Sequence, residues 1–204
     1  MRNRAEIMLI TLIRHGETKG NLEKRYIGKT EEEVCREGIA SLRRMMEKNK
    51  YPLAKKLVTS PMLRCIQTAR ILYPGKEYEI REDFRECNFG LFENESYQTL
   101  RDNRDYQRWL KSQGKLPFPG GESMADFKKR CREEFESLMS VWEQKETSLV
   151  LIVHGGTIMA IMEEFCDTRK AFYDWQVKNG EGFICSYDKT KKKLTMQSRI
   201  IREE

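Results

Sequence analysis

Residues 7–18 have the sequence IMLITLIRHGET. The first seven form an apolar run with a single threonine, which is typical of a strand buried on both faces in a parallel sheet. A second such run lies at 149–153, and each run leads into a histidine followed by glycine. The chain has only two histidines, His15 and His154, so their matching positions predict one site built from two strand ends.

Helical and strand patterns alternate along the rest of the chain. We expect further strands at 57–59 and 77–80 and a hairpin of strands at 183–187 and 194–200. Helices are predicted from a capping box at Thr30–Glu33 to about residue 48, and from Ser60 and Pro61, as N-cap and first helical residue, to residue 72. One or two helices are expected between residues 96 and 111, and others at 123–142 and 158–165. This order predicts a single domain over residues 1–204, of the α/β class. We expect a three-layer α/β/α sandwich whose mostly parallel sheet has an antiparallel edge.

Composition limits the function further. Charged residues make up 34% of the 204 residues, and no apolar stretch approaches the roughly 18–20 residues that a membrane span needs. The basic N-terminus leads into a short apolar run without a small-residue cleavage site, so we expect no signal peptide and a cytoplasmic protein. The six cysteines are widely spaced, which predicts free thiols.

The net charge is +6, and much of the excess lies at 189–193, where a solvated turn between strands is expected. The chain has no groove-reading motif, so we predict no nucleic-acid partner and no membrane partner. A small anionic ligand remains the expected partner.

Cationic side chains accompany the two histidines. Arg14 precedes His15, and Arg64 lies one turn into the helix that follows the second strand. Guanidinium groups bind phosphoryl oxygens in a bidentate manner, and Asn21 can add one more hydrogen bond. An imidazole among cations stays neutral near pH 7 and is able to attack phosphorus. The expected ligand is a phosphate, whose oxygens would also meet the N-terminus of that helix.

A catalytic carboxylate is harder to select. Spacing alone leaves five candidates near loops, namely Glu17, Glu82, Glu86, Glu93 and Glu122. A metal centre is not expected, because neither histidine has a nearby aspartate or cysteine partner at ligand spacing.

Five blocks in order resemble the signature of the histidine phosphatase superfamily, which includes the phosphoglycerate mutases. The blocks are LIRHGET at 12–18 with Asn21, SPMLRCIQTA at 60–69, RECNFG at 85–90, PGGES at 119–123 and VHGGT at 153–157. The resemblance implies a phosphoglycerate mutase-like fold and a site that needs no metal and no cofactor.

The resemblance also implies roles for individual residues. His15 would be the nucleophile and form a phosphohistidine, and Glu86 would be the general acid and then the base. The phosphoryl group would be held by Arg14, Asn21, Arg64, His154 and Gly155. Ile27 and Gly28 occupy the positions where relatives contact the substrate.

The PGGES block and the short chain resemble small phosphatases of the α-ribazole phosphatase type. We therefore expect a phosphomonoester hydrolase for a small phosphorylated metabolite, with α-ribazole phosphate as one candidate. Two alternatives stay open, a phosphoglycerate mutase-type transferase and a catalytically silent phosphate-binding module. Mutases usually carry an arginine pair that has no match between residues 92 and 119, and commonly have threonine where this chain has Ile27.

Many phosphatases have Trp-Glu-Gly where this chain has Phe92-Glu93-Asn94, and asparagine tolerates the left-handed backbone of such a turn.

Overall fold

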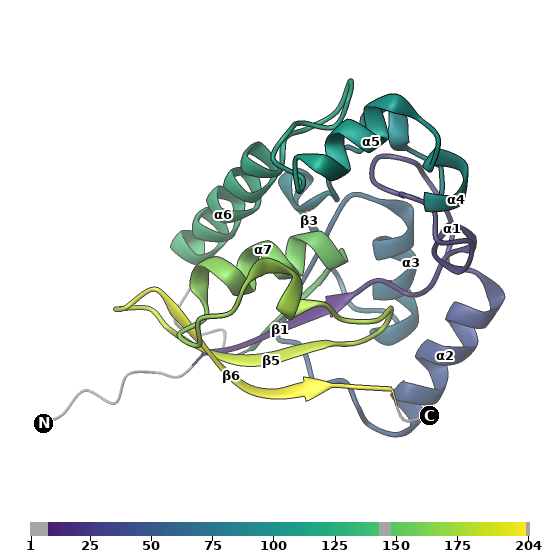
Figure 1. Cartoon of the computed structure of the whole chain (residues 1–204). Helices are drawn as coiled ribbons and strands as arrows, with labels where there is room; N and C mark the ends of the chain where they lie inside the picture. The colour runs from purple at the N-terminus through teal and green to yellow at the C-terminus, as the bar shows by residue number, and fades with distance from the viewer. Residues whose placement is uncertain (1–7, 143–147, 203–204) are drawn as a thin grey trace, which may run out of the picture.

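Six strands form one mixed sheet at the centre of the molecule (Figure 1). The structure is a computed structural model, and it describes residues 8–142 and 148–202. The strand order is β3-β2-β4-β1-β5-β6. The parallel strands are β3 (Glu79–Ile80), β2 (Lys56–Thr59), β4 (Ser148–Val153) and β1 (Met8–Arg14). The hairpin of β5 (Gly182–Asp188) and β6 (Lys193–Ile200) adds the antiparallel edge, which confirms the predicted sheet. Ile7, the first residue of the predicted strand, and the basic N-terminus lie outside the described residues.

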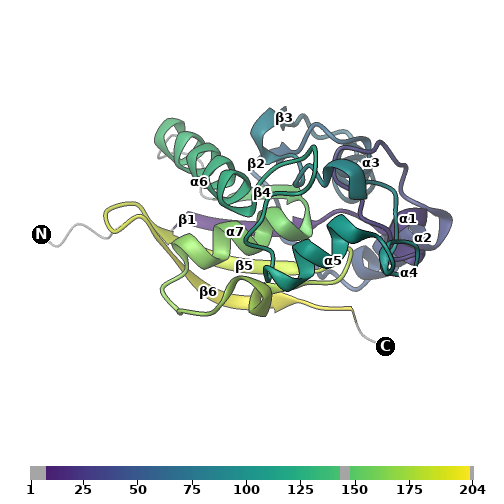
Figure 2. The same ribbon diagram turned by 45° about the horizontal axis from the view of Figure 1, so that its top comes forward.

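Helices cover both faces of the sheet (Figure 2). One face carries α2 (Arg36–Glu47) and α3 (Leu63–Leu72), and the other carries α6 (Met124–Val141) and α7 (Gly155–Phe165). The shorter helices are α1 (Lys19–Leu22), α4 (Tyr97–Leu100) and α5 (Arg104–Lys111), and 3₁₀ turns lie at Glu82–Phe84, Gly90–Phe92 and Phe172–Trp175. The three-layer architecture is therefore as predicted.

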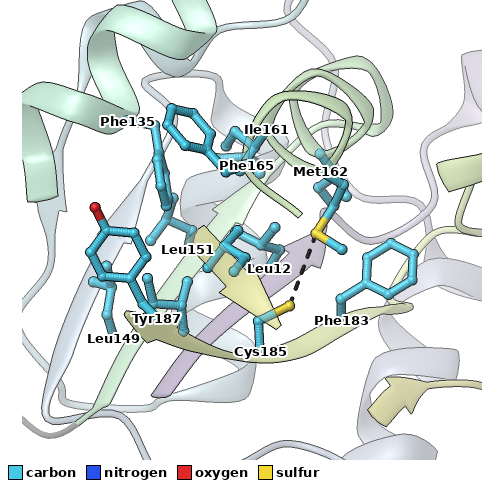
Figure 3. Close-up of a cluster of buried hydrophobic side chains, with 14 of the residues drawn as sticks. Leu12, Phe135, Leu149, Leu151, Ile161, Met162, Phe165, Phe183, Cys185 and Tyr187 are labelled. Atoms are coloured by element: carbon cyan, nitrogen blue, oxygen red, sulfur yellow. Dashed lines mark hydrogen bonds between the residues drawn. The ribbon is translucent and has the colours of Figure 1, made fainter. Parts of the chain in front are cut away.

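Strand β4 shows why the apolar runs are continuous. Leu149 and Leu151 pack into the cluster formed with α6 and α7 (Figure 3), to which Val153 also belongs. Val150 and Ile152 pack into the opposite cluster, with residues of α2 and α3. Since successive side chains of a strand point to opposite faces, a strand between two helical layers must be apolar at every position.

Helix α2 begins later than predicted. The expected capping box at Thr30–Glu33 does not form, and the N-cap is Cys35, whose sulfur accepts the Gly38 N–H. The side chains of the predicted box make tertiary hydrogen bonds instead. The Thr30 hydroxyl donates to Glu93, and Glu31 accepts the N–H of Leu63.

Helix α3 also begins later, at Leu63 rather than at Pro61, with Met62 as its N-cap. Ser60, the predicted cap, directs its hydroxyl to His154. The Leu63 N–H at the start of α3 donates to the Glu31 carboxylate at 2.9 Å. The predicted Ser60 cap was therefore wrong, and the approach of a phosphate to this helix terminus stays a prediction.

A third cluster of buried side chains lies between α5, α6 and the loops around residue 90. All six cysteines are free thiols, as predicted. None of the helices in the described ranges is both long and apolar enough to cross a bilayer. The single domain over 1–204 remains our proposal.

Candidate active site

His15 follows β1 and lies almost completely buried, with 4% of its surface exposed. Its Nδ1 is 2.8 Å from the carbonyl oxygen of Gly16. A carbonyl oxygen only accepts, so Nδ1 carries the ring proton and Nε2 carries the lone pair. The Gly16 N–H donates to the Thr68 hydroxyl at 2.8 Å, which ties this turn to α3. The backbone thus fixes which nitrogen of His15 carries the lone pair.

His154 follows β4 and is fully buried. The centroids of the His15 and His154 rings are 5.2 Å apart, with an angle of 64° between the ring planes. The predicted convergence of the two strand ends is thus present, because β1 and β4 are adjacent parallel strands. The Nε2 of His154 lies 2.7 Å from the hydroxyl oxygen of Ser60.

Arg14 and Arg64 are each held by backbone carbonyl groups. Arg14 donates to the Val177 oxygen at 2.9 Å. Arg64, which is fully buried, donates to the oxygens of Thr30 at 2.9 Å and Gly28 at 2.8 Å. In both arginines the Nε atom is buried and has no hydrogen-bond partner among the described residues. A buried N–H without an acceptor is unfavourable, and a phosphoryl oxygen would satisfy it.

The electrostatics of the cluster favour neutral imidazoles. Burial, together with Arg64 and Arg14, holds the pKa of His15 well below its ordinary value. Burial also lowers the pKa of His154, and Arg64 and His15 add to the shift. Both effects disfavour an added proton, so each ring is neutral near pH 7.

Glu86 faces the same cluster from the loop after the first 3₁₀ turn. Its carboxylate accepts the N–H of Cys87 and the N–H of Gly156, each at 3.0 Å. Burial raises the pKa of this carboxyl above its ordinary value, although the two N–H groups oppose the shift. A carboxyl with a raised pKa beside a phosphate site suits proton transfer to and from oxygen.

Asn179, which the sequence did not indicate, links the side chain of Asn21 to the backbone of His15. The Asn179 side chain donates to the oxygen of His15 at 3.1 Å and to Oδ1 of Asn21 at 2.9 Å. Oδ1 also accepts the Thr18 N–H, so the side-chain NH₂ of Asn21 remains as its donor. Asn179 stands in an irregular loop, and no motif in the sequence indicates it.

Comparison with known proteins agrees with this geometry. The family model described as the histidine phosphatase superfamily (branch 1) matches residues 10–198. The chain belongs to this superfamily. Solved structures similar to this chain include the α-ribazole phosphatase of Shigella flexneri, with a TM-score of 0.84 over 96% of this chain and 97% of that chain. At 20% sequence identity, this match shows a common fold alone.

Two other known proteins are more similar to this chain in sequence. The phosphoglycerate mutase of Thermus thermophilus is 28% identical, with a TM-score of 0.69 over 96% of this chain and all of that chain (100%). The human 6-phosphofructo-2-kinase/fructose-2,6-bisphosphatase 4 is 33% identical over 162 residues, which are 78% of this chain and 33% of the human protein.

Glu93 organises the loop behind Arg64. Its carboxylate accepts five donors at 2.7–3.3 Å, which are the N–H groups of Gly28, Lys29, Thr30 and Phe89 and the Thr30 hydroxyl. Gly28 and Thr30 in turn offer their carbonyl oxygens to Arg64. Asn94 adopts a φ of 69°, so the turn survives without glycine, as expected.

Ile27 and Gly28 were predicted to contact the substrate. In the structure they lie behind Arg64, and the two cavities described below are lined by other residues. Their contact with substrate stays a prediction. Of the other carboxylates considered, Glu122 pairs with Arg130, and Glu17 lines a polar hollow next to Arg14.

A cavity of about 730 Å³ opens beside Glu86, Arg14 and Gly155. Its wall is largely aromatic and apolar, with Trp109 stacked on Phe118 at a centroid distance of 4.9 Å. A second hollow of about 370 Å³ adjoins Arg14 and Asn21 and is lined mainly by polar and basic side chains. Across the described ranges, no group of three or more histidine, cysteine, aspartate or glutamate residues is arranged to hold a metal ion.

Proposed function

We propose that this chain is a phosphomonoester hydrolase that acts through a phosphohistidine formed on His15. The observation that carries the proposal is the contact between His15 Nδ1 and the Gly16 oxygen at 2.8 Å. It leaves the lone pair on Nε2, in a ring that burial and two arginines keep neutral. Such an imidazole is a competent nucleophile for phosphorus.

The reaction has two steps. In the first, Nε2 of His15 attacks phosphorus, the bond from phosphorus to the ester oxygen breaks, and Glu86 gives its proton to the departing oxygen. In the second, water attacks the phosphorus of the phosphohistidine, Glu86 takes a proton from that water, and the bond from phosphorus to Nε2 breaks, which releases inorganic phosphate and restores His15. Donors on the equatorial oxygens would come from Arg14, Asn21, Arg64, His154 and the N–H of Gly155.

We propose that the reaction needs no metal ion. The guanidinium groups of Arg14 and Arg64 supply positive charge at the phosphoryl oxygens, the role that Mg²⁺ plays in many phosphoryl-transfer enzymes. Activity should therefore persist after exhaustive chelation. Strong inhibition by a chelator that added metal reverses would contradict this part of the proposal.

The substrate that we propose is a small phosphorylated metabolite whose alcohol enters the larger cavity. That cavity has the volume of a typical small-molecule site. Its aromatic wall favours a leaving group with a flat apolar part, and α-ribazole phosphate, which joins a ribose phosphate to an aromatic base, is one candidate. The match to the Shigella flexneri α-ribazole phosphatase supports the fold of such an enzyme.

A mutase is the second candidate, because the Thermus thermophilus phosphoglycerate mutase covers nearly the whole chain at 28% identity. A mutase returns the phosphoryl group to a second hydroxyl, whereas a hydrolase transfers it to water. A silent binding module is the third, and it would bind phosphate without turnover.

One set of measurements separates these functions. Purified protein is incubated with sugar, nucleotide, glycerate and ribazole phosphomonoesters, and free phosphate is measured without a bisphosphate primer. A hydrolase releases phosphate from at least one ester, and His15→Ala abolishes both turnover and labelling of the protein by ³²P. Isomerised phosphoester without free phosphate would establish the mutase, and binding without turnover would establish the module.

A further inference from the structure

Arg130 lies on α6, and the reaction proposed above does not use it. Its side chain is mostly buried, with 12% of its surface exposed. Two of its nitrogens hold Glu122 of the PGGES block, with Nε 2.9 Å from Oε1 and Nη2 2.9 Å from Oε2. This bidentate geometry is the strongest form of an arginine–carboxylate pair.

The other N–H groups of Arg130 reach the loop that carries the general acid. Nη1 donates to the carbonyl oxygens of Asp83 at 2.7 Å and Arg85 at 3.0 Å, and Nη2 donates to that of Glu86 at 3.4 Å. With the two bonds to Glu122, all five N–H groups of the guanidinium have acceptors. The Arg130 side chain therefore holds three backbone carbonyl groups, one of them that of Glu86 itself.

Glu122 holds the other flank of the same loop. Its Oε2 accepts the N–H of Asn88 at 3.3 Å, and its backbone N–H donates to the Asn88 oxygen at 2.9 Å. Between the two 3₁₀ turns, residues 85–89 have no helix or strand to hold them. The Arg130–Glu122 pair therefore holds the backbone on both sides of Glu86, where no helix or strand holds it.

We propose that Arg130 and Glu122 are positioning residues for Glu86, and that this pair sets how well the leaving oxygen is protonated. The inference rests on the proposed function. Neither residue lies among those lining the larger cavity, so they act through the loop and not on the substrate. Their contribution is geometric, because a general acid must lie within hydrogen-bond reach of the oxygen that it protonates.

The leaving group provides the test. An alkyl alcohol is a poor leaving group and needs the proton from Glu86, whereas 2,4-dinitrophenolate departs without it. Arg130→Lys keeps the charge but loses the planar set of five donors. We expect it to lower kcat/KM by about 10²-fold for the best alkyl phosphomonoester in the panel, as a displacement of about 1 Å can. The loss for 2,4-dinitrophenyl phosphate should be at least about tenfold smaller.

Two further variants make the experiment decisive. Glu122→Gln keeps the backbone bond from its N–H to the Asn88 oxygen and should show the same selective loss, so it replaces Arg130→Lys if that protein does not fold. Arg132→Lys is the matched control on the same helix, because Arg132 is 41% exposed and its ion pair with Glu133 is long at 3.9 Å. This control should leave both esters unchanged.

An equal loss for both esters in Arg130→Lys and Glu122→Gln would overturn the positioning role and leave the proposed function standing. If the unaltered protein hydrolyses neither ester and no other phosphomonoester, the proposed function fails, and the inference fails with it.

Discussion

The hydroxyl oxygen of Ser60 lies 2.7 Å from Nε2 of His154, so the loop after β2 holds the ring of the second histidine. Ser60 Oγ also accepts the N–H of Met62 at 3.4 Å, and the hydroxyl keeps its proton and a second lone pair for the ring. The proposed role of His154 as a donor to the phosphoryl group needs an N–H that Ser60 does not engage. We therefore predict that Ser60 donates to Nε2 and that neutral His154 carries its proton on Nδ1.

Ser60→Ala should remove the hydrogen bond that favours the Nδ1–H tautomer of His154. Without the hydroxyl, Nε2 loses its donor, the two tautomers of His154 mix, and the population able to donate from Nδ1 falls. We expect a loss in kcat of about tenfold or more, because removing one donor to a developing anion costs up to 10²–10³-fold. The ¹⁵N spectrum of the imidazoles checks the cause directly, since the chain has only two histidines. A His154 signal that stays with the Nδ1–H tautomer in the variant would contradict the assignment.

Glu93→Gln should weaken phosphate binding through Arg64. Five donors converge on the Glu93 carboxylate, and the amide that replaces it has one oxygen fewer to accept them. The loop at 28–30 would then hold Arg64 less well. We expect the Kd for inorganic phosphate, measured by calorimetry, to rise about tenfold, equivalent to about 1.4 kcal/mol. Glu95→Gln changes an exposed glutamate two residues away and should leave the Kd unchanged.

Gly156→Ala should disable the general acid sterically. A Cβ at this position would overlap Oε1 of Glu86 and lie 3.0 Å from the Phe127 ring. A Cβ at Gly155 would meet the Arg14 guanidinium at 3.5 Å or more, an ordinary contact. Gly156→Ala should therefore lower kcat for an alkyl phosphate by about 10²-fold, the lower end of the range for a general acid, and by more than Gly155→Ala does. Equal losses in the two variants would argue against a steric effect on Glu86.

The sheet was predictable because the apolar pattern that indicates each central strand lies within one short segment of the sequence. A strand between two helical layers is apolar on both faces, and the runs that end at Ile13 and Val153 have this property except at Thr11. Parallel neighbours then bring their carboxyl ends together, which is why His15 and His154 could be placed in one site.

The starts of α2 and α3 were not predictable, because tertiary bonds overrode local capping. Thr30, Glu31 and Ser60 all have the side chains of helix caps. In the fold each one bonds a distant partner instead, namely Glu93, Leu63 and His154. These partners lie 30 or more residues away, and the local pattern of a helix cap does not show which distant group competes for its side chain.

The positioning residues escaped detection for a related reason. Arg130 stands in a helix rich in charged residues, where an arginine is ordinarily solvated, and its three carbonyl acceptors leave no pattern in side-chain identity. Glu93 and Glu122 were visible as carboxylates near loops, and the fold shows that both hold backbone N–H groups.

The pH dependence should identify the acid. Burial raises the pKa of Glu86, and only the protonated carboxyl can donate to the leaving oxygen, so kcat/KM should fall as the pH rises through that pKa. His15 must be unprotonated to attack, and burial lowers its pKa, so it should cause no loss of activity near its ordinary value of about 6.5. Glu86→Gln cannot ionise, so the slower variant should lack the alkaline limb. Measuring both proteins with the same ester cancels the ionisation of the substrate phosphate, whose second pKa is about 6. An alkaline limb that persists unchanged in Glu86→Gln would show that another group is the acid.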